Sequence, residues 1–528
     1  MNTALHNMPL EQPKQLETSP LAEHFVSVCR AERSSYPQRA PFDPPTRYPE
    51  LSGTGLAQST DSENAVYSAV RESLHLLGLD ESHFGTPRWN PLGAVVHHGD
   101  SVLIKPNWVS QKHELNDTWQ QIITHGAVLR AVIDYVQIAL GGQGAIWLAD
   151  GPMLNSDFAE ISRRTGAACL EEFYNKLSGV CPLELIDLRS VLFETRDDVV
   201  VSRSSLPGDP RGNVAVDLGA HSAFYHFAGE GRYYGADYDT DEVNQHHHGE
   251  TQQYQLSGSA MQADVIIDVP KLKTHHKVGV TLALKGVVGL NTNRNWLPHR
   301  TQGTPRKGGD QFANSGIRQR LEQTVVRMFE RASLRFPRAV PPIYRLAKRV
   351  GRTVLGASHR TIRGGGWHGN DTLWRMVLDI NRALQYADTE GQLHETPRRR
   401  RFCVVDGIIA GEGTGPVFAD PRAAGVVLAG SCPAVVDTVG AELIGFDHTH
   451  IPMLAQAFVP HPLPLTSVTP ADIQVLSNMP PWCGSLAEMS ANHPFLFTAP
   501  LGWEDHIERL ETVSMPTTAE ASAKGGQA

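Results

Sequence analysis

The chain has 528 residues, of which 41% are hydrophobic and 20% are charged, and its formal net charge at pH 7 is −9. This composition is ordinary for a globular protein and excludes global disorder. A protein with this negative net charge is not generally attracted to nucleic acid or anionic lipid, so we expect no nucleic-acid partner. The chain is too long to form one ordinary hydrophobic core, so its length predicts two or three structural units.

The sequence lacks the usual signs of export or membrane insertion. Its first residues, MNTALHNMPLEQPKQ, have no basic region followed by an apolar region, as a signal peptide would. No stretch approaches the roughly 20 apolar residues that a transmembrane helix needs. The six cysteines are scattered without C-x-x-C spacing, which argues against an iron–sulfur cluster, a structural zinc site or a disulfide framework. We therefore expect a cytoplasmic protein with no transmembrane segment and no iron–sulfur cluster.

Residues 1–95 are predicted to be an N-terminal extension that is partly irregular, because they are rich in proline, serine and other polar residues. One helix is expected at 62–78, where Val66, Val70 and Leu74 recur at helical spacing. The remainder of this segment is expected to wrap the surface or to be partly disordered.

Residues 96–315 are predicted to form the first part of an α/β core. Strands are expected at 101–107, 144–152 and 183–188. A helix over 124–142 would begin at Thr124 as N-cap and end at Gly141. The alternation of strands and helices indicates an α/β fold with a mostly parallel sheet flanked by helices.

Residues 316–365 form a basic segment with only Glu322 and Glu330 as acidic residues. Apolar residues at helical spacing predict an inserted amphipathic helix that packs over the sheet. Its basic face could make a surface contact with acidic lipid, polysaccharide or nucleic acid. The alternative, which we favour, is a solvated face.

The α/β pattern resumes over residues 366–480, the second part of the core. Helices are expected at 371–386 and 432–445, and a strand at 425–430. The run from 401 to 413 predicts a strand that enters a glycine-rich loop. Residues 481–528 are a C-terminal segment whose tail, from about 515, has a disordered composition.

Polar side chains follow four of the apolar strands. Ligands of open parallel sheets bind outside the carboxyl ends of the strands, where loops and helix N-termini converge. A lysine inside an apolar run, as Lys285 is, must reach solvent or find a partner, since burying it unpaired is costly. The candidate site residues are Lys105, Asn107, His125, Asp150, Lys271, Lys273, His275, Lys285, Asp406 and Asp437.

Several candidates also have a purely structural explanation. Asp150 and Asp406 each precede glycine and would suit a turn. Asp437 falls in the first turn of an expected helix, where the helix dipole alone favours a carboxylate by about 0.3–1 kcal/mol.

Metal and nucleotide motifs are weak in this sequence. The run 246–248 contains three histidines, which with His275 or His276 could bind a divalent metal, although a solvated loop is the favoured interpretation. The loop GEGTGP at 411–416 is not a phosphate-binding loop, and no G-x-S-x-G elbow is present. The cofactor is therefore left open, with a divalent metal as one option.

Seven pieces of the sequence, in order, resemble the domain of unknown function 362 (DUF362) family. The most specific are PKLKTH at 270–275 and ALKGVVG at 283–289; IKPN at 104–107 and VVDTVGAELIGFD at 435–447 are others. The resemblance covers roughly residues 100–300 and 370–460. It implies the same ten candidate residues, but it brings no established reaction. Unlike some members, this chain has no cysteine-rich module, and the basic insertion is an addition.

Three functions are compatible with these features. The first is an enzyme acting on a small anionic metabolite, a carboxylate or phosphate, as an isomerase, epimerase or lyase. His275, Lys273, Lys285 and Asp406 would then be catalytic, and the other six candidates would bind substrate. The second is a binding or accessory protein that holds an anionic metabolite or polymer without turnover. The third assigns the function to the surface of residues 316–365.

Overall fold

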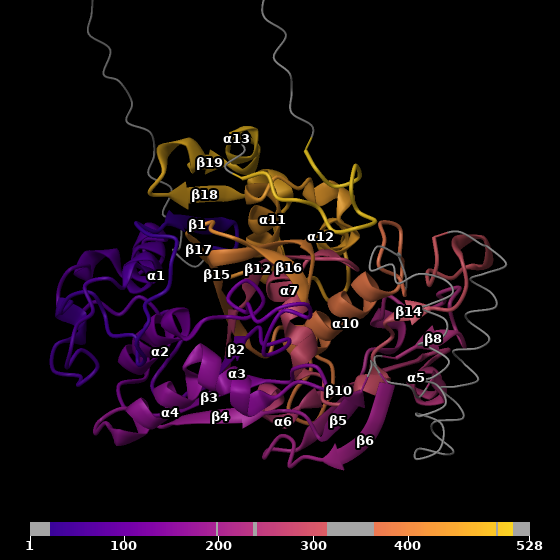
Figure 1. The fold of residues 1–528 in the computed structure, drawn as a ribbon, viewed down its shortest axis with the longest axis horizontal. Helices are drawn as coiled ribbons and strands as arrows, with labels where there is room; N and C mark the ends of the chain where they lie inside the picture. The colour runs from indigo at the N-terminus through magenta and orange to yellow at the C-terminus, as the bar shows by residue number, and fades with distance from the viewer. Residues whose placement is uncertain (1–21, 197–198, 236–239, 314–363, 493–494, 510–528) are drawn as a thin grey trace, which may run out of the picture.

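The computed structural model describes residues 22–196, 199–235, 240–313, 364–492 and 495–509 (Figure 1). The basic insertion predicted at 316–365 therefore lies outside the described residues, except for Gly364 and Gly365, and so does the tail from about 515.

One large mixed sheet organises the described residues, with helices on both sides, which confirms the predicted α/β class (Figure 1). Its strands run parallel from β15 through β11, β2 and β3 to β4, whereas the other side of the sheet mixes antiparallel pairs with one parallel pair, β1 and β18. In spatial order they are β19 (Gly484–Ser485), β18 (Gln474–Ser477), β1 (Phe25–Arg30), β17 (Val426–Gly430), β15 (Arg400–Thr414), β11 (Val265–Val269), β2 (Ser101–Pro106), β3 (Ala145–Asp150) and β4 (Leu183–Asp187).

The long strand β15 joins the two parts of the core. On one side it pairs with β11 and then with β12 (Lys271–His275), which follow one another across Pro270. On the other side it pairs with β17 and then with β16 (Phe418–Arg422). A short strand, β13 (Gly279–Val280), pairs with β12.

The predicted glycine-rich loop within 401–413 is wrong, because β15 continues through it to Thr414. Its glycines serve close packing between strands and loops. A Cβ at Gly407 would meet the Val426 carbonyl oxygen at 2.9 Å, and one at Gly411 would meet the Gln121 carbonyl oxygen at 2.7 Å. The glycines therefore permit neighbouring backbone to approach the strand.

Helices cover both faces of the sheet, and successive strand residues point to opposite cores. In β17, Val426 and Leu428 belong to one hydrophobic cluster and Val427 and Ala429 to the other. The first cluster includes α7 (Leu282–Gly286), α10 (Leu373–Tyr386), α11 (Pro433–Leu443), α12 (Pro452–Ala457) and α13 (Leu486–Ala491). The second includes α1 (Ala65–Leu76), α2 (Gly126–Leu140), α3 (Phe158–Thr165) and α4 (Ala167–Lys176).

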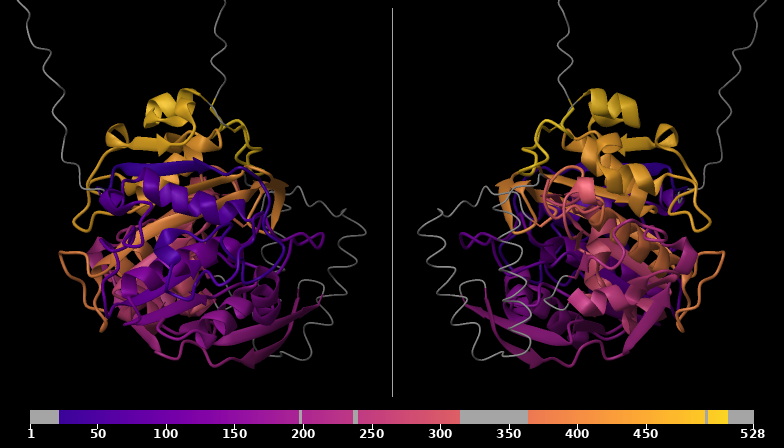
Figure 2. Two further views of the ribbon diagram at one scale, coloured as in Figure 1. Left: turned by 90° about the vertical axis from the view of Figure 1, so that its left-hand side faces the viewer. Right: turned by 90° about the vertical axis from the view of Figure 1, so that its right-hand side faces the viewer.

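The N-terminal segment contributes a strand to the interior of this sheet, which the sequence did not suggest. β1 pairs antiparallel with β17 and parallel with β18, so the early and late parts of the chain lie side by side (Figure 2, indigo and yellow). Val26 and Val28 of β1 are fully buried. Residues 22–95 thus form part of the core as well as covering it.

Helix α2 ends as predicted but begins one residue later. Gly141 takes the left-handed conformation at its C-cap, with φ of 56°. The N-cap is His125, whose side chain accepts from the Ala127 N–H. Thr124 is unavailable because its hydroxyl donates to the Val269 carbonyl and accepts from the Asn107 N–H, which ties β2 to β11.

Smaller elements between β4 and α10 complete the described chain. They are the hairpin β5 (Val191–Arg196) and β6 (Val199–Ser205), the sheet of β7 (Asn213–Asp217), β10 (Thr251–Ser257) and β9 (His247–His248), the pair β8 (Tyr233–Tyr234) and β14 (Arg300–Thr301), and the helices α5 (Thr240–His246) and α6 (Gly258–Gln262). Among the described residues, every helix is too short or too polar to traverse a lipid bilayer.

Candidate functional site

A cavity of about 400 Å³ lies at the carboxyl ends of β2, β3 and β12. Its walls come from residues 107–109 after β2, 150–155 at the end of β3, 275–277 at the end of β12, and 285–289 on and after α7. The ends of parallel strands are where open α/β sheets bind ligands. The volume is within the range of small-molecule sites.

Lys105 and Asp150 form a buried ion pair beside this cavity. Their Nζ and Oδ1 atoms are 2.8 Å apart, and the residues are 2% and 3% exposed. Asp150 also accepts from the backbone N–H groups of Trp108 and Gly151, each at 2.7 Å. The carboxylate is therefore fully engaged, and it shapes the loops that follow both β2 and β3.

Gly289 is the residue that lets the ion pair fit. A Cβ at this position would overlap Asp150 Oδ1 and would lie 3.1 Å from Lys105 Nζ. The last glycine of the ALKGVVG motif is thus required by the packing of the ion pair against the chain that follows α7.

Lys285 reaches the cavity from α7, and Asp437 fixes the start of that helix. The Asp437 carboxylate accepts from the N–H groups of Ala283 and Leu284, at 2.8 and 2.7 Å. Burial, together with the positive charges of Arg294 and Lys105, lowers the pKa of Lys285 to about 7. Within the described chain, its ammonium forms no ion pair.

The end of β12 brings His275 and Lys277 to the same cavity. The Lys277 N–H donates to His275 Nδ1 at 3.1 Å, so a neutral His275 carries its proton on Nε2. Burial and the nearby Lys285 hold the pKa of His275 well below its ordinary value. Burial and Arg300 lower the pKa of Lys277 to about 7.

Arg294 and His299 also line the cavity. Arg294 donates to the carbonyl oxygens of Val288, Gly151 and Pro152, and it has no carboxylate partner among the described residues. Burial lowers its pKa to about 10. His299 Nδ1 donates to the Leu297 carbonyl at 3.1 Å, which leaves Nε2 of the neutral ring as an acceptor.

The structure brings six of the ten candidate residues together: five at the cavity, and Lys273 buried close enough to Lys285 to feel its charge. Asn107, Asp150, His275 and Lys285 line the cavity, and Lys105 is bonded to Asp150. Lys273 is fully buried and its Nζ donates to the Ile122 carbonyl. Burial, and then the nearby Lys285, hold the pKa of Lys273 well below its ordinary value.

Three other candidates, His125, Lys271 and Asp406, belong to a second buried cluster with Tyr36. Lys271 Nζ lies 3.1 Å from Asp406 and donates to the Tyr36 hydroxyl at 2.6 Å. Tyr36 donates in turn to Asp406 at 2.6 Å and stacks on His125 with 3.9 Å between ring centroids. None of the four lines the cavity.

The tenth candidate, Asp437, lies in α11 and acts on α7 rather than on the cavity. It does not line the cavity, and its bonds to Ala283 and Leu284 hold the segment that carries Lys285. Its two backbone partners explain its position better than the dipole of its own helix does.

Sequence reasoning missed Lys277, Arg294 and His299. Lys277 continues the every-second-residue pattern of Lys271, Lys273 and His275, which was a usable signal. Arg294 and His299 follow no motif that marks them. The approach of their segment to the end of β3 depends on long-range contacts such as the bond from Arg294 to Gly151.

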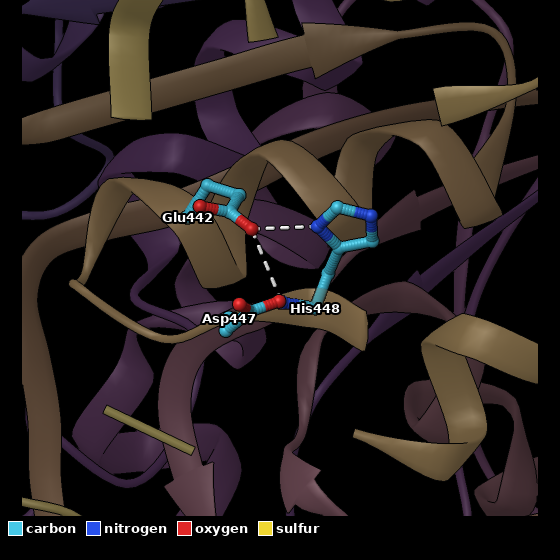
Figure 3. A group of neighbouring side chains, drawn as sticks. All are labelled: Glu442, Asp447 and His448. Atoms are coloured by element: carbon cyan, nitrogen blue, oxygen red, sulfur yellow. Dashed lines mark hydrogen bonds and ion pairs between the residues drawn. The ribbon is translucent and has the colours of Figure 1, made fainter. Parts of the chain in front are cut away.

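One group in the described residues has the geometry of a metal site, and it lies away from the cavity. Glu442, Asp447 and His448 offer ligand atoms within 4.8 Å of one another (Figure 3). Glu442 already accepts from His448 Nδ1 at 2.6 Å, from Ser490 at 2.7 Å and from Arg509. These partners lower the pKa of Glu442 to about 2 despite its burial. The group is a satisfied polar network, and a metal would have to displace Arg509.

The run 246–248 does not join His275 or His276 in such a group within the described chain. His246 bonds to Gln253 at 2.9 Å, and His247 bonds to Gln252 and to the Trp296 carbonyl.

The fold and the site together define an α/β protein with a cavity at the strand ends. Residues 188–442 match the family model described as domain of unknown function (DUF362), and this match confirms the resemblance to that family. Lys105, Asn107, His125 and Asp150 precede the matched residues. Comparisons with curated proteins and with solved structures gave no match.

Proposed function

We propose that this protein is an enzyme that acts on a small anionic metabolite, a carboxylate or a phosphate, by lysine and histidine acid–base chemistry. The observation that carries the proposal is the charge of the cavity lining. Among the described residues, Lys277, Lys285 and Arg294 line it without a carboxylate partner, and the only carboxylate of the described lining, Asp150, is paired with Lys105. Such a lining favours an anionic ligand, because the ligand supplies the missing negative charge.

The protonation states suit transfer of a proton near neutral pH. Lys285, with a pKa of about 7, is a base when neutral and an acid when protonated. His275 holds its proton on Nε2 and is placed on a different element, β12. The two groups approach the cavity from different walls, so neutral Lys285 can remove a proton from a carbon beside an acid group while the Nε2–H of neutral His275 donates a hydrogen bond to the oxygen that gains negative charge. This supports isomerase, epimerase or lyase chemistry.

The second candidate is a protein that binds an anionic metabolite or polymer without turnover. It is favoured by the complete engagement of Asp150, which leaves the described residues of the lining without a free carboxylate base. A divalent metal remains an option for either function. The composition and the scattered cysteines favour a cytoplasmic location. A surface contact through residues 316–365 remains a prediction, because nearly all of these residues lie outside the part of the chain that the structure describes.

Solvent hydrogen exchange separates the two candidates. The purified protein is incubated in deuterated water with a panel of small carboxylates and phosphates, and incorporation of deuterium at carbon is followed by NMR. An enzyme of the proposed class incorporates deuterium into at least one compound, and Lys285→Met abolishes the incorporation. Lys307→Met, at an exposed lysine that does not line the cavity, is the matched control and retains it. Binding without exchange would reject the enzyme in favour of the binding protein.

A further inference from the structure

The cations that line the cavity fall into two groups on different elements. Lys285 and Arg294 form the first group, next to the end of β3. Arg294 bonds to the Gly151 carbonyl there, and Arg294 and Lys105 are the positive charges that act most strongly on Lys285. Lys277 forms the second group with His299, beyond the end of β12, where the charges acting most strongly on Lys277 are Arg300 and Asp310.

Neither group is neutralised by an ion pair within the described chain. Asp150, near the first group, is already paired with Lys105. Asp310, near the second, accepts from the N–H groups of Thr301 and Asp371 at 2.7 and 3.0 Å and forms no ion pair with Lys277. Among the described residues, two positions on different walls of the cavity therefore keep an ammonium or guanidinium group without a carboxylate partner.

Apolar side chains make up much of the remaining wall. Trp108, Val288 and Leu373 line the same cavity, as do Met153 and Phe193. A cavity of about 400 Å³ with apolar walls and cations in two places suits a short carbon chain with an acid group at each end.

Resting on the proposed function, we propose that the ligand is a small dianion with two separate acid groups, one held by Lys285 and Arg294 and the other by Lys277. A monoanion would leave one cation buried without a counter-charge. The second acid group makes charge-assisted hydrogen bonds there, which are expected to tighten binding at least about 10-fold. Lys277 is thus a residue that determines specificity for the second acid group.

Matched pairs of anions test this inference. Succinate and butyrate, glutarate and pentanoate, and adipate and hexanoate each have equal chain length and differ by one carboxylate. 2-Carboxyethylphosphonate and propylphosphonate extend the comparison to a phosphorus acid. Isothermal titration calorimetry at low salt, slightly below neutral pH, measures each dissociation constant. At least one dianion is expected to bind about 10-fold or more tightly than its partner.

Variants at position 277 test whether Lys277 causes the preference for the dianion. Lys277→Met is expected to weaken the preferred dianion to the affinity of its partner and to leave the partner unchanged, whereas Lys277→Arg restores the preference. Lys307→Met is the control, and thermal unfolding without ligand checks that each variant is folded.

Equal affinities within every pair, or equal weakening of both members by Lys277→Met, would overturn the inference while the proposed function survives. Absence of binding by all these anions would overturn the anionic ligand itself and the proposed function with it.

Discussion

The Lys105 ammonium and the Asp150 carboxylate form a buried ion pair, with 2.8 Å between Nζ and Oδ1, against the backbone of Gly289. The pair joins the ends of two neighbouring strands, β2 and β3, to the segment that follows α7. It also removes the negative charge of Asp150 from the cavity. Lys277, Lys285 and Arg294, which line the same cavity, then have no carboxylate partner among the described residues.

Asp150→Asn is expected to destabilise the protein by about 3–5 kcal/mol, because it leaves the Lys105 ammonium buried without its partner. Urea denaturation measures the change in the free energy of unfolding. The double variant Lys105→Met/Asp150→Asn, which removes both charges, is expected to recover part of the loss. A loss below about 1 kcal/mol in the single variant would contradict a stabilising role for the pair.

Gly289→Ala is expected to cost about 1–3 kcal/mol of stability, since its Cβ would overlap Asp150 Oδ1 and force the ion pair apart. Gly286→Ala in the same motif is the matched control, because a Cβ there meets only the Pro270 Cβ, at 3.9 Å. Chemical denaturation of both variants checks the prediction. Equal effects of the two substitutions would show that the close approach at Gly289 is unimportant.

Lys285→Met is expected to stabilise the ligand-free protein by about 1–4 kcal/mol at neutral pH, because burial of an ammonium without a partner opposes folding. The folded pKa, about 7, lies below the ordinary 10.5, so the unfolded chain binds more protons between these values. The contribution of Lys285 to wild-type stability therefore rises with pH across that window, and the advantage of Lys285→Met shrinks. Thermal and urea unfolding at several pH values measure both trends. A destabilised Lys285→Met at neutral pH would contradict the expectation.

Acid is expected to weaken the network around Glu442. Its pKa is lowered from the ordinary 4.5 to about 2, so its ion pairs stabilise the fold above 4.5, and this contribution is lost as the pH falls toward 2. The full contribution is about 3 kcal/mol. In Glu442→Gln, this part of the pH dependence should disappear in urea titrations. If the free energy of unfolding of Glu442→Gln still fell with pH below 4.5 as it does in wild type, the pH dependence would belong to other groups.

The sequence was sufficient to place the cavity at the strand ends. Lys105 and Asp150 each follow an apolar strand, and the carboxyl ends of parallel strands meet at one edge of a sheet. The alternation of strands and helices predicted the sheet itself. These are local patterns, and local patterns are what a single sequence reveals.

The division of the candidates into two clusters could not be predicted. The register of β12 against β15 shifts between Lys271 and Lys273, and Lys271 bonds to Tyr36, 235 positions earlier in the chain. Tyr36 comes from a segment expected to lie on the surface, and no motif links it to the sheet. Asp437 similarly finds its partners in α7, far away in the sequence. These pairings follow from packing between distant segments.

The pH dependence of anion binding tests the central claim most directly. Glutarate, or whichever anion binds best, is titrated calorimetrically into wild type and Lys285→Met at about pH 6 and about pH 9, on either side of the pKa values of Lys277 and Lys285. Both lysines lose their charge as the pH rises through about 7, so wild type should bind at least about 10-fold more weakly at the higher pH. Lys285→Met should bind weakly at both. Equal affinity of wild type and Lys285→Met at both pH values would contradict a basic cavity that accepts an anion at Lys285.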